Sequence, residues 1–470
     1  MIQEVANMPF VDREREMSAL EAAYENPAAS LFVVYGRRRV GKTTLLAEFC
    51  KDKHALYYLA TEESIQANCA AFREMVADFL QDELLRSAAN ASWDMIFKTL
   101  LAQPSEEKLV IIIDEFQYLG KADKAFPSVF QKIWDTQLRN KNVEVILCGS
   151  LVHMMMEQTL SYSSPLYGRR TGQIKLKQIP YAYYNQFFPA MSEQERILYY
   201  AVTGGVPKYI ELFHQGKDIY DDILQNVFTP QSFLYEEPEF LLRHEVNDIG
   251  SYFSIIRSVA AGNCRMSDIA ASLSIPVTSL PKSLKTLCDL DILEREVPPS
   301  EKNVETSKKG QYRIRDNFLA FWFRFVYPMR SFIESGHAEI AMNKLRSGFI
   351  PNHVGYVYED ICRSKMWELN AQGKLPFLFD RVGRWWGGKD TEIDIVAIDT
   401  NDRSNIMFGE CKFHQNTQMQ LSELRQLKAK AAAVQWGKAN RTEYFILFCI
   451  SGYSEELHRL AESDPHIILG

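Results

Sequence analysis

The fold of this 470-residue chain is decided by Leu31-Phe-Val-Val-Tyr-Gly36-Arg-Arg-Arg-Val-Gly41-Lys42-Thr43-Thr44. A short β-rich run ends at Gly36 and helical spacing begins at Gly41, so strand, glycine-rich turn and helix follow one another. The turn matches G-x-x-x-x-G-K-[ST] in full, which is the pattern of a phosphate-binding loop, or P-loop. The N-terminus of the helix behind it adds a favourable dipole for anions. The stretch therefore predicts a nucleotide site.

Every residue of this loop is a candidate ligand of ATP. Lys42 is expected to reach the terminal phosphates, and the Thr43 hydroxyl is expected to ligate Mg²⁺. The glycines let backbone N–H groups wrap the phosphates. The full candidate set comprises Gly36, Arg37, Arg38, Arg39, Val40, Gly41, Lys42, Thr43 and Thr44.

A second run, Leu109-Val-Ile-Ile-Ile-Asp114-Glu115, supplies the acids that such a site needs. An apolar central strand delivers the acid pair at its carboxyl end, which is the Walker B arrangement. Asp114 is expected to hold Mg²⁺ through water, and Glu115 is expected to polarise the attacking water. The two motifs together predict an ATP-hydrolysing enzyme with ATP and Mg²⁺ as cofactors.

Three further residues have two interpretations each. Ser150 is the polar end of the strand expected at 143–150, where it either senses the γ-phosphate or caps the next helix. Arg169 and Arg170 follow a Pro-Leu-Tyr-Gly turn. One of them acts as an arginine finger, in cis or across a subunit interface of a homo-oligomer, or both make surface ion pairs.

Alternating apolar strands and helical stretches predict an α/β fold. The apolar runs 31–36, 56–59, 109–113 and 143–148 are nearly continuous, as in a parallel sheet covered on both faces. A chain of this length exceeds one core. The expected domains are a P-loop ATPase core (1–190), a helical lid (191–249), a winged helix (250–330) and a carboxyl-terminal α/β domain (331–470).

The winged helix is expected from helices at 266–273 and 277–290 and from strand-like runs at 292–297 and 311–315. Residues 250–315 carry ten basic and seven acidic side chains. Binding of DNA or RNA would use local basic charge, because the whole chain has a net charge of −7. The candidates are Lys282, Lys285, Lys308 and Lys309. A winged helix used for protein contacts is the alternative.

The stripe of Phe318, Phe321, Trp322 and Phe325 predicts a buried connector.

A set of motifs in order resembles the archaeal-type ATPase family, relatives of the STAND and AAA-like NTPases. They are Phe10-Val-Asp-Arg13, the triple-arginine P-loop, Asp114-Glu-Phe-Gln-Tyr, Cys148-Gly-Ser150, Ser164-Pro-Leu-Tyr-Gly-Arg169 and Thr203-Gly-Gly-Val-Pro-Lys-Tyr209. The resemblance covers the first half densely, and the stretch Asp316-Asn-Phe-Leu-Ala-Phe-Trp-Phe-Arg-Phe fits it too. It implies that Phe10 and Arg13 lie near the adenine and that Thr203–Tyr209 begins the lid.

The carboxyl-terminal domain carries a second constellation of charged residues. Asp394 lies on one β-rich run, and Glu410-Cys411-Lys412 lies on the next, with the polar turn 399–404 between them. Paired as a hairpin, they would bring two carboxylates and a lysine together. Asp394 and Glu410 then hold a divalent ion, and Lys412 neutralises charge. The spacing resembles the PD-(D/E)XK, or restriction-endonuclease-like, fold, in which Glu359 stands where a helix supplies a third metal-binding acid. A cross-strand ion pair is the ordinary alternative.

Two functions follow from these patterns. In the first, ATP state controls metal-dependent cleavage of DNA or RNA by the carboxyl-terminal domain. In the second, the chain is an ATP-driven switch or scaffold whose carboxyl-terminal domain binds nucleic acid or a partner without cutting. Residues 341–470 carry sixteen basic and sixteen acidic side chains, so this domain has no net attraction for phosphate.

No run has the length of a membrane span or a signal peptide, and a cytoplasmic location is expected.

Overall fold

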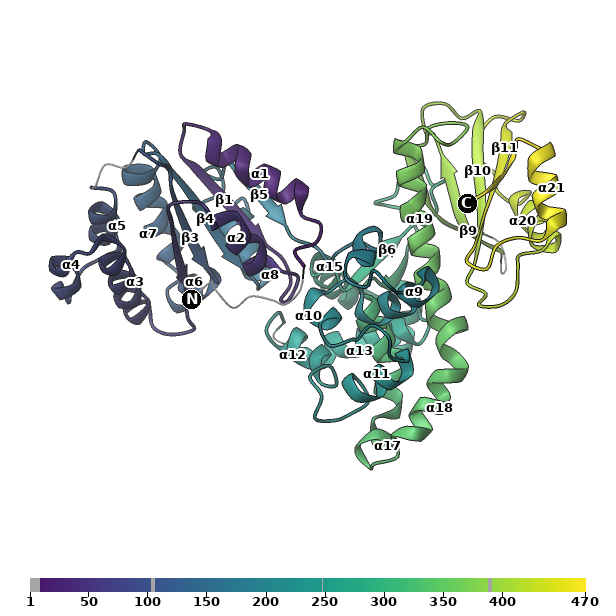
Figure 1. Ribbon diagram of the computed structural model, residues 1–470, viewed down its shortest axis with the longest axis horizontal. Helices are drawn as coiled ribbons and strands as arrows, with labels where there is room; N and C mark the ends of the chain where they lie inside the picture. Colours follow the sequence, from purple (N-terminus) through teal and green to yellow (C-terminus); the bar gives the residue numbers. More distant parts are fainter. Residues whose placement is uncertain (1–8, 103–105, 247, 388–390) are drawn as a thin grey trace. The chain divides into compact units, whose positions relative to one another are not determined.

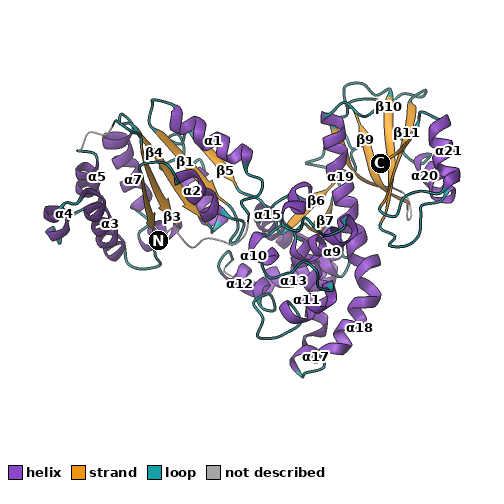
Figure 2. Cartoon of the chain, in the orientation of Figure 1, coloured by secondary structure: helices purple, strands orange, loops and turns teal. Residues whose placement is uncertain are grey.

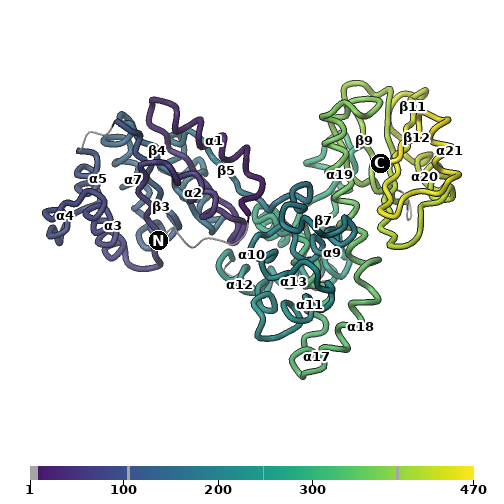
Figure 3. The backbone as a smooth tube through the Cα atoms, viewed as in Figure 1, coloured from purple at the N-terminus to yellow at the C-terminus, as the bar shows by residue number. Residues whose placement is uncertain are grey.

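The computed structural model describes residues 9–102, 106–246, 248–387 and 391–470 (Figure 1). They fall into two units. The amino-terminal unit comprises Met1–Phe187, Gly205–Glu211 and Arg243–Asn247, and the carboxyl-terminal unit comprises Phe188–Gly204, Leu212–Leu242 and Asp248–Gly470. Figure 3 traces the chain through them in sequence order. The finer division into four domains stays a prediction.

A five-stranded parallel sheet organises the amino-terminal unit, as predicted. Its strand order is β2-β3-β4-β1-β5, and every neighbouring pair is parallel. Strand β4 therefore lies between β1, which leads into the P-loop, and β3, which carries the acid pair. The strands are β1 (Ser30–Tyr35), β2 (Ala55–Leu59), β3 (Leu109–Asp114), β4 (Val143–Gly149) and β5 (Gly172–Lys175). Because parallel strands end at one edge, their carboxyl ends bring the loop and the acids together.

Helices cover this sheet on both faces, which explains why β1, β3 and β4 are buried along their whole length. On one face, α1 and α2 contribute Leu20, Leu45 and Phe49 to a core with β1, β3 and β4. Aromatic rings from α3, α5 and α7 pack together in a second cluster. The helices of this unit are α1 (Glu14–Glu25), α2 (Lys42–Cys50), α3 (Ile65–Leu80), α4 (Glu83–Ser87), α5 (Trp93–Leu100), α6 (Gln117–Ala122), α7 (Phe126–Ile133), η1 (Trp134–Leu138), α8 (Val152–Met155), η2 (Met156–Leu160), η3 (Tyr181–Gln186) and α10 (Pro207–Ile210).

Helices dominate the first part of the carboxyl-terminal unit (Figure 2). The predicted stripe of Phe318, Phe321, Trp322 and Phe325 is buried, which confirms it as a core element. The indole N–H of Trp322 donates to the Tyr235 carbonyl at 2.8 Å. The helices that precede α19 are α9 (Glu193–Thr203), α11 (Ile219–Asn226), α12 (Glu237–Arg243), α13 (Ile249–Ala260), α14 (Met266–Leu273), η4 (Val277–Ser279), α15 (Leu280–Asp289), α16 (Asn317–Phe321), η5 (Trp322–Val326), η6 (Tyr327–Met329), α17 (Arg330–Glu334), α18 (Ala338–Phe349) and η7 (Ile350–Val354).

Helices α13, α14 and α15 are followed by an antiparallel hairpin, as the winged-helix prediction required. Strand β6 (Leu293–Glu296) pairs with β7 (Gln311–Ile314). The intervening loop carries Lys308 and Lys309, and both side chains are exposed. The hairpin is short, so its stability depends on the helices that it packs against.

A second, mixed sheet closes the chain, with strand order β12-β11-β10-β9-β8. Strands β8, β9 and β10 are antiparallel neighbours, whereas β10, β11 and β12 run parallel. Helix α20 packs its apolar side into the core of this sheet, and α19 packs on β10 beside Cys411. The elements are α19 (Gly355–Ala371), β8 (Arg381–Gly387), β9 (Thr391–Ile398), β10 (Asn405–Lys412), α20 (Leu421–Ala431), β11 (Thr442–Cys449), α21 (Glu455–Ser463) and β12 (Ile467–Leu469).

None of the helices in the described ranges combines the length and the apolar character needed to cross a membrane. Strands β5, β8 and β12 were not expected from the sequence. β5 and β12 have only four and three residues, and β8 is rich in arginine, tryptophan and glycine, so none of the three shows a clear apolar alternation.

Candidate functional site

The P-loop connects β1 to α2 with the backbone geometry that its glycines permit. Gly41 has φ 94° and Arg39 has φ 73°, both in the left-handed region. A Cβ at Gly36 would lie 2.3 Å from the Leu176 carbonyl oxygen. Glycine at position 36 is therefore required by the close approach of the chain that follows β5.

Lys42 is buried at the base of this loop. Its ammonium group donates to the Gly36 and Arg37 carbonyls, at 2.9 Å each. Burial lowers the pKa of Lys42, while the thiol of Cys148 and the carboxylates of Glu115, Asp114 and Glu245 oppose that shift. The predicted phosphate ligand thus lies among acids from three separate segments. Glu245 was not predicted as a member of this group.

Asp114 ends β3 and is almost fully buried. Its carboxylate accepts the hydroxyl of Tyr57 from β2 and the Glu115 N–H at 2.9 Å. Tyr57 also interacts with the Thr43 side chain, and its burial followed by the charge of Asp114 raises the pKa of its phenol. The two predicted magnesium ligands, Thr43 and Asp114, are therefore joined through one tyrosine.

Glu115 is held by three donors. Its carboxylate accepts the Ser150 N–H at 3.1 Å, the Ser150 hydroxyl at 2.8 Å and the Gln117 side-chain amide. The backbone of Glu115 has φ 53°, an uncommon value for a residue other than glycine. Ser150 does not cap the next helix, because α8 begins after Leu151 without a side-chain cap. Its hydroxyl instead lies beside the predicted catalytic acid.

The remaining loop residues have structural contacts. Arg38 donates to the Tyr118 hydroxyl at 3.0 Å, and Arg37 is buried. Arg13, which the family resemblance placed near the adenine, donates to the Val40 carbonyl at 3.0 Å and to the Lys177 carbonyl at 2.6 Å. Arg13 therefore ties the start of α1 to the P-loop and to the chain beyond β5. Thr43 is exposed, and Thr44 is half-buried.

Arg169 and Arg170 are both engaged by local partners. Arg169 forms a two-pronged ion pair with Asp135, with its shortest contact at 2.7 Å, and also donates to the Pro165 carbonyl. Arg170 donates to the Leu160 carbonyl and lies over the Tyr167 ring. The contacts of Arg169 match the ion-pair alternative. The arginine-finger role stays a prediction.

The carboxyl-terminal constellation lies on adjacent strands, as predicted. Strands β9 and β10 pair through Ile395 and Gly409, so Asp394 and Glu410 are the next residues beyond the ladder. Asp394 accepts the Cys411 N–H at 2.9 Å. Glu410 is buried and bonds to the ammonium groups of Lys412 at 2.7 Å and Lys430 at 3.1 Å. Lys430, on α20, was not predicted.

The acids of this cluster raise one another's pKa values. Burial, and then the charge of Glu410, raises the pKa of Asp394. Burial, and then the charge of Asp394, raises the pKa of Glu359 to about 7, while Arg384 and Arg363 oppose that shift. Arg384 bonds to the Glu359 carboxylate at 3.0 Å.

Each carboxylate therefore already has a cation or an N–H beside it. Across the described ranges, no three or more His, Cys, Asp or Glu side chains are arranged so that they could hold a metal ion. The proposed ligands Glu359, Asp394 and Glu410 are close enough to repel, but they are not gathered into a preformed metal site.

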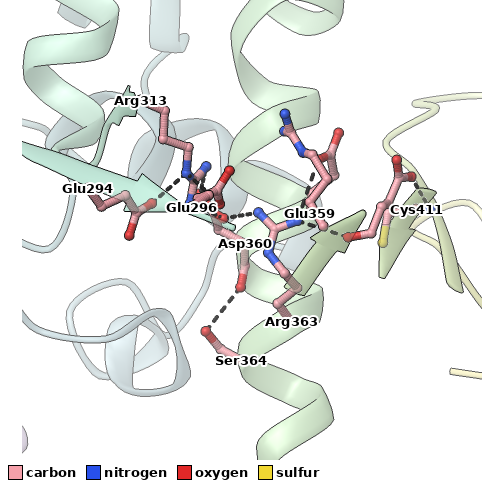
Figure 4. Close-up of polar contacts among 10 residues, drawn as sticks. Glu294, Glu296, Arg313, Glu359, Asp360, Arg363, Ser364 and Cys411 are labelled. Carbon is pink, nitrogen blue, oxygen red and sulfur yellow. Dashed lines mark hydrogen bonds and ion pairs between the residues drawn. The ribbon is translucent and has the colours of Figure 1, made fainter. Parts of the chain in front are cut away.

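A charged network links this cluster to the β6–β7 hairpin (Figure 4). Arg313 on β7 pairs with Glu294 and Glu296 on β6 and with Asp360 on α19, at 2.5, 2.9 and 2.5 Å. Arg363 bonds to the same Asp360 carboxylate and donates to the Asp394 carbonyl at 3.1 Å. The hairpin and the carboxylate strands thus share one chain of ionic contacts through α19.

The four lysines proposed for nucleic-acid binding lie on one helix and on the hairpin loop that follows it. Lys282 and Lys285 lie on α15, and Lys308 and Lys309 lie on the loop of the hairpin. All four side chains are exposed. Lys309 pairs with Glu301 at 2.8 Å.

Comparison with known proteins identifies two families along the chain. Residues 10–213 match an ATPase domain found predominantly in Archaea. Residues 322–426 match a family of archaeal and bacterial proteins of unknown function. The first match covers the P-loop, both acids, Ser150 and the Arg169-Arg170 pair, so the amino-terminal unit contains an ATPase domain.

Relatives in one archaeon extend this likeness. An uncharacterized protein of Methanocaldococcus jannaschii is 34% identical over 404 residues, which cover 86% of this chain and 87% of that protein. An uncharacterized ATP-binding protein of the same organism is 46% identical over 44 residues, 9% of this chain and 75% of that protein. Among solved structures, a Walker-type ATPase of Pyrococcus abyssi matches with a TM-score of 0.49 and 22% identity, covering 69% of this chain and 100% of that chain.

Proposed function

This chain belongs to the archaeal-type P-loop ATPases, and we propose that its magnesium-dependent ATPase cycle controls a nuclease-like carboxylate site in its carboxyl-terminal unit. The observation that carries the proposal is the meeting of Asp394, Glu410 and Lys412 at the end of the β9–β10 ladder. The substrate would be DNA or RNA, recognised through the winged helix.

The groups around Lys42 support the assignment of the ATPase site. Lys42 donates only to carbonyls of its own loop, and a phosphate oxygen would be a stronger, charge-assisted acceptor. Arg37, Arg38 and Arg39 add positive charge to the loop, and its backbone N–H groups are suited to bind an anion. Thr43 and Asp114 are oxygen donors already linked through Tyr57, which suits a hard divalent cation. When bound there, Mg²⁺ supplies charge that stabilises the transferring phosphoryl group.

Glu115 is the proposed base that orients the attacking water. Ser150 and Gln117 donate to one of its carboxylate oxygens, Oε2, so the other oxygen would accept from the water, and proton transfer to Glu115 would change the carboxylate that Ser150 binds. Ser150, at the end of the strand between the P-loop and the acids, would report this change. In this role Ser150 is a positioning residue.

The carboxyl-terminal cluster has the kinds of metal ligand that phosphodiester cleavage uses. Glu359, Asp394 and Glu410 offer carboxylate oxygens, the ligands that Mg²⁺ and Mn²⁺ prefer. Binding of a divalent cation would take over the neutralising role of Lys412 and Lys430 at Glu410. The released ammonium groups could then neutralise the phosphate of a nucleic acid.

One observation favours the second function, a switch or scaffold that does not cut. Glu359 and Glu410 are both paired with cations of the chain itself, and such pairs stabilise a fold without any metal. In that case the same cluster is structural, and the carboxyl-terminal unit binds nucleic acid or a protein.

The first prediction separates nucleotide binding from hydrolysis. We expect Lys42→Ala to weaken ATP binding by about tenfold or more, because the charge at the terminal phosphates is lost. Glu115→Gln should keep binding and slow hydrolysis about 100-fold or more, because the base is lost. Titration with a fluorescent ATP analogue and phosphate release measure the two effects. Lys51→Ala, an exposed lysine at the end of α2, is the control. Hydrolysis by Glu115→Gln at the parental rate would remove this residue from its assigned role.

The second prediction tests the arginine finger in a homo-oligomer. Loss of a finger should slow hydrolysis about 10³-fold in Arg169→Ala, in Arg170→Ala or only in the double variant. Asp135→Ala is the matched control, because it breaks the ion pair and leaves Arg169 in place. If all four variants hydrolyse ATP at the parental rate and both partners of the ion pair cost about 0–1 kcal/mol of stability, the pair is structural.

The third prediction places nucleic-acid affinity on the winged helix. Lys282→Glu with Lys285→Glu should weaken duplex binding and lower the slope of log K against log salt by about 2, because two phosphate contacts are lost. Fluorescence anisotropy across a salt series measures the slope. Lys374→Glu, an equally exposed lysine beyond α19, should leave it unchanged. An identical loss in Lys374→Glu would show that general charge, not this surface, determines binding.

The fourth prediction concerns cleavage. With Mg²⁺ or Mn²⁺, the parent should cut plasmid or oligonucleotide at a rate that depends on ATP. Asp394→Asn and Glu410→Gln should each reduce cleavage about 100-fold or more, because metal ligands are lost. Glu392→Gln, an exposed acid on the same strand, should cut normally. Absence of cleavage by the parent under every metal and nucleotide condition would favour the switch.

A further inference from the structure

Glu245 is an acid of the nucleotide site that the proposed hydrolysis does not use. It lies in the segment that follows α12 and belongs to the amino-terminal unit, 203 residues after Lys42 along the chain. One carboxylate oxygen accepts the Val152 N–H at 3.3 Å. Val152 begins α8, two residues after Ser150. The segment thus returns to the end of β4, beside the γ-phosphate sensor proposed above.

The second carboxylate oxygen of Glu245 is buried and has no hydrogen-bond partner among the residues that the structure describes. A buried, unpaired carboxylate oxygen is costly. Burial raises the pKa of Glu245 to about 7, and the N–H groups of Val152 and His153, followed by the charges of Arg37 and Lys42 of the P-loop, oppose that shift. The carboxylate of Glu245 therefore lies in the field of two P-loop cations, one of which is the lysine expected to bind the terminal phosphates.

The Glu245 carboxylate and a terminal phosphate beside Arg37 and Lys42 would repel each other. ADP leaves the region beyond the β-phosphate empty, whereas the γ-phosphate of ATP brings additional negative charge to Lys42. Because Glu245 interacts with Lys42 and Arg37, repulsion by its carboxylate should act chiefly on the terminal phosphate.

We propose that Glu245 is a specificity-determining residue of the nucleotide site that disfavours the γ-phosphate and so sets the preference between ATP and ADP. The inference rests on the nucleotide site proposed above. It assigns to the segment after α12 a direct role in nucleotide choice. ATP binding then brings a γ-phosphate toward this carboxylate, whereas ADP binding does not.

Glu245→Gln tests the inference with little change of shape. The glutamine oxygen can still accept the Val152 N–H, while the negative charge is removed. Affinities for ATP and ADP are measured by calorimetry on the full chain, with and without Mg²⁺. We expect ATP to bind on the order of tenfold tighter and ADP to change less than about threefold. Glu236→Gln, an exposed acid nine residues earlier, is the matched control and should keep the parental ratio.

The ratio of the two affinities is measured on one protein, so a moderate loss of stability does not imitate the effect. Glu245→Ala removes the charge by another route and should shift the ratio in the same direction, and a thermal melt confirms folding. An unchanged ratio in both variants overturns the inference. Weaker binding of Mg²⁺–ATP with unchanged binding of metal-free ATP also overturns it, because Glu245 would then assist the metal. Failure of the parent to bind either nucleotide would instead contradict the nucleotide site itself.

Discussion

The buried ammonium group of Lys42 is the constraint around which the amino-terminal unit is arranged. A charge removed from water must be neutralised or hydrogen-bonded, and the chain supplies both. Two loop carbonyls bind the ammonium directly, and the charges of Glu115, Asp114 and Glu245 oppose the lowering of its pKa by burial. The parallel sheet makes this possible, because its carboxyl edge gathers segments that are far apart in sequence. The left-handed backbone at Gly41 and the close approach at Gly36 shape the loop that holds the lysine.

The sequence was informative where a local pattern determines geometry. The P-loop needs only its own spacing, and the strands β1, β3 and β4 are buried apolar runs. The hairpin that pairs Asp394 with the Glu410 strand follows from two runs and a polar turn. Glu245 and Lys430 could not be found in this way. Each meets its partner only through tertiary packing, and each lies in a stretch where an acid or a lysine is ordinary.

The contacts of Tyr57 and Gln117 also could not be predicted from the sequence, although their partners lie closer along the chain. Tyr57 has a neighbouring tyrosine on β2, and only the register with β3 decides which phenol reaches Asp114. Gln117 belongs to the Asp114-Glu-Phe-Gln-Tyr motif, which does not indicate that its side-chain amide donates to Glu115. Arg13 was linked to the adenine by resemblance, whereas its guanidinium group binds carbonyls on either side of the P-loop. The contacts of these three residues depend on the direction of their side chains, which residue identity alone does not give.

The ionic network through α19 limits how this chain can be recombined. Arg313 belongs to the β6–β7 hairpin, but Asp360, which it shares with Arg363, belongs to α19. A chimera that imports the hairpin of a relative without the matching α19 would leave a partly buried guanidinium group or carboxylate without its counter-ion, a change that is costly in most proteins. The hairpin and α19 should therefore be exchanged together in a chimera. The boundaries of the exchanged segment should lie outside both elements rather than between them.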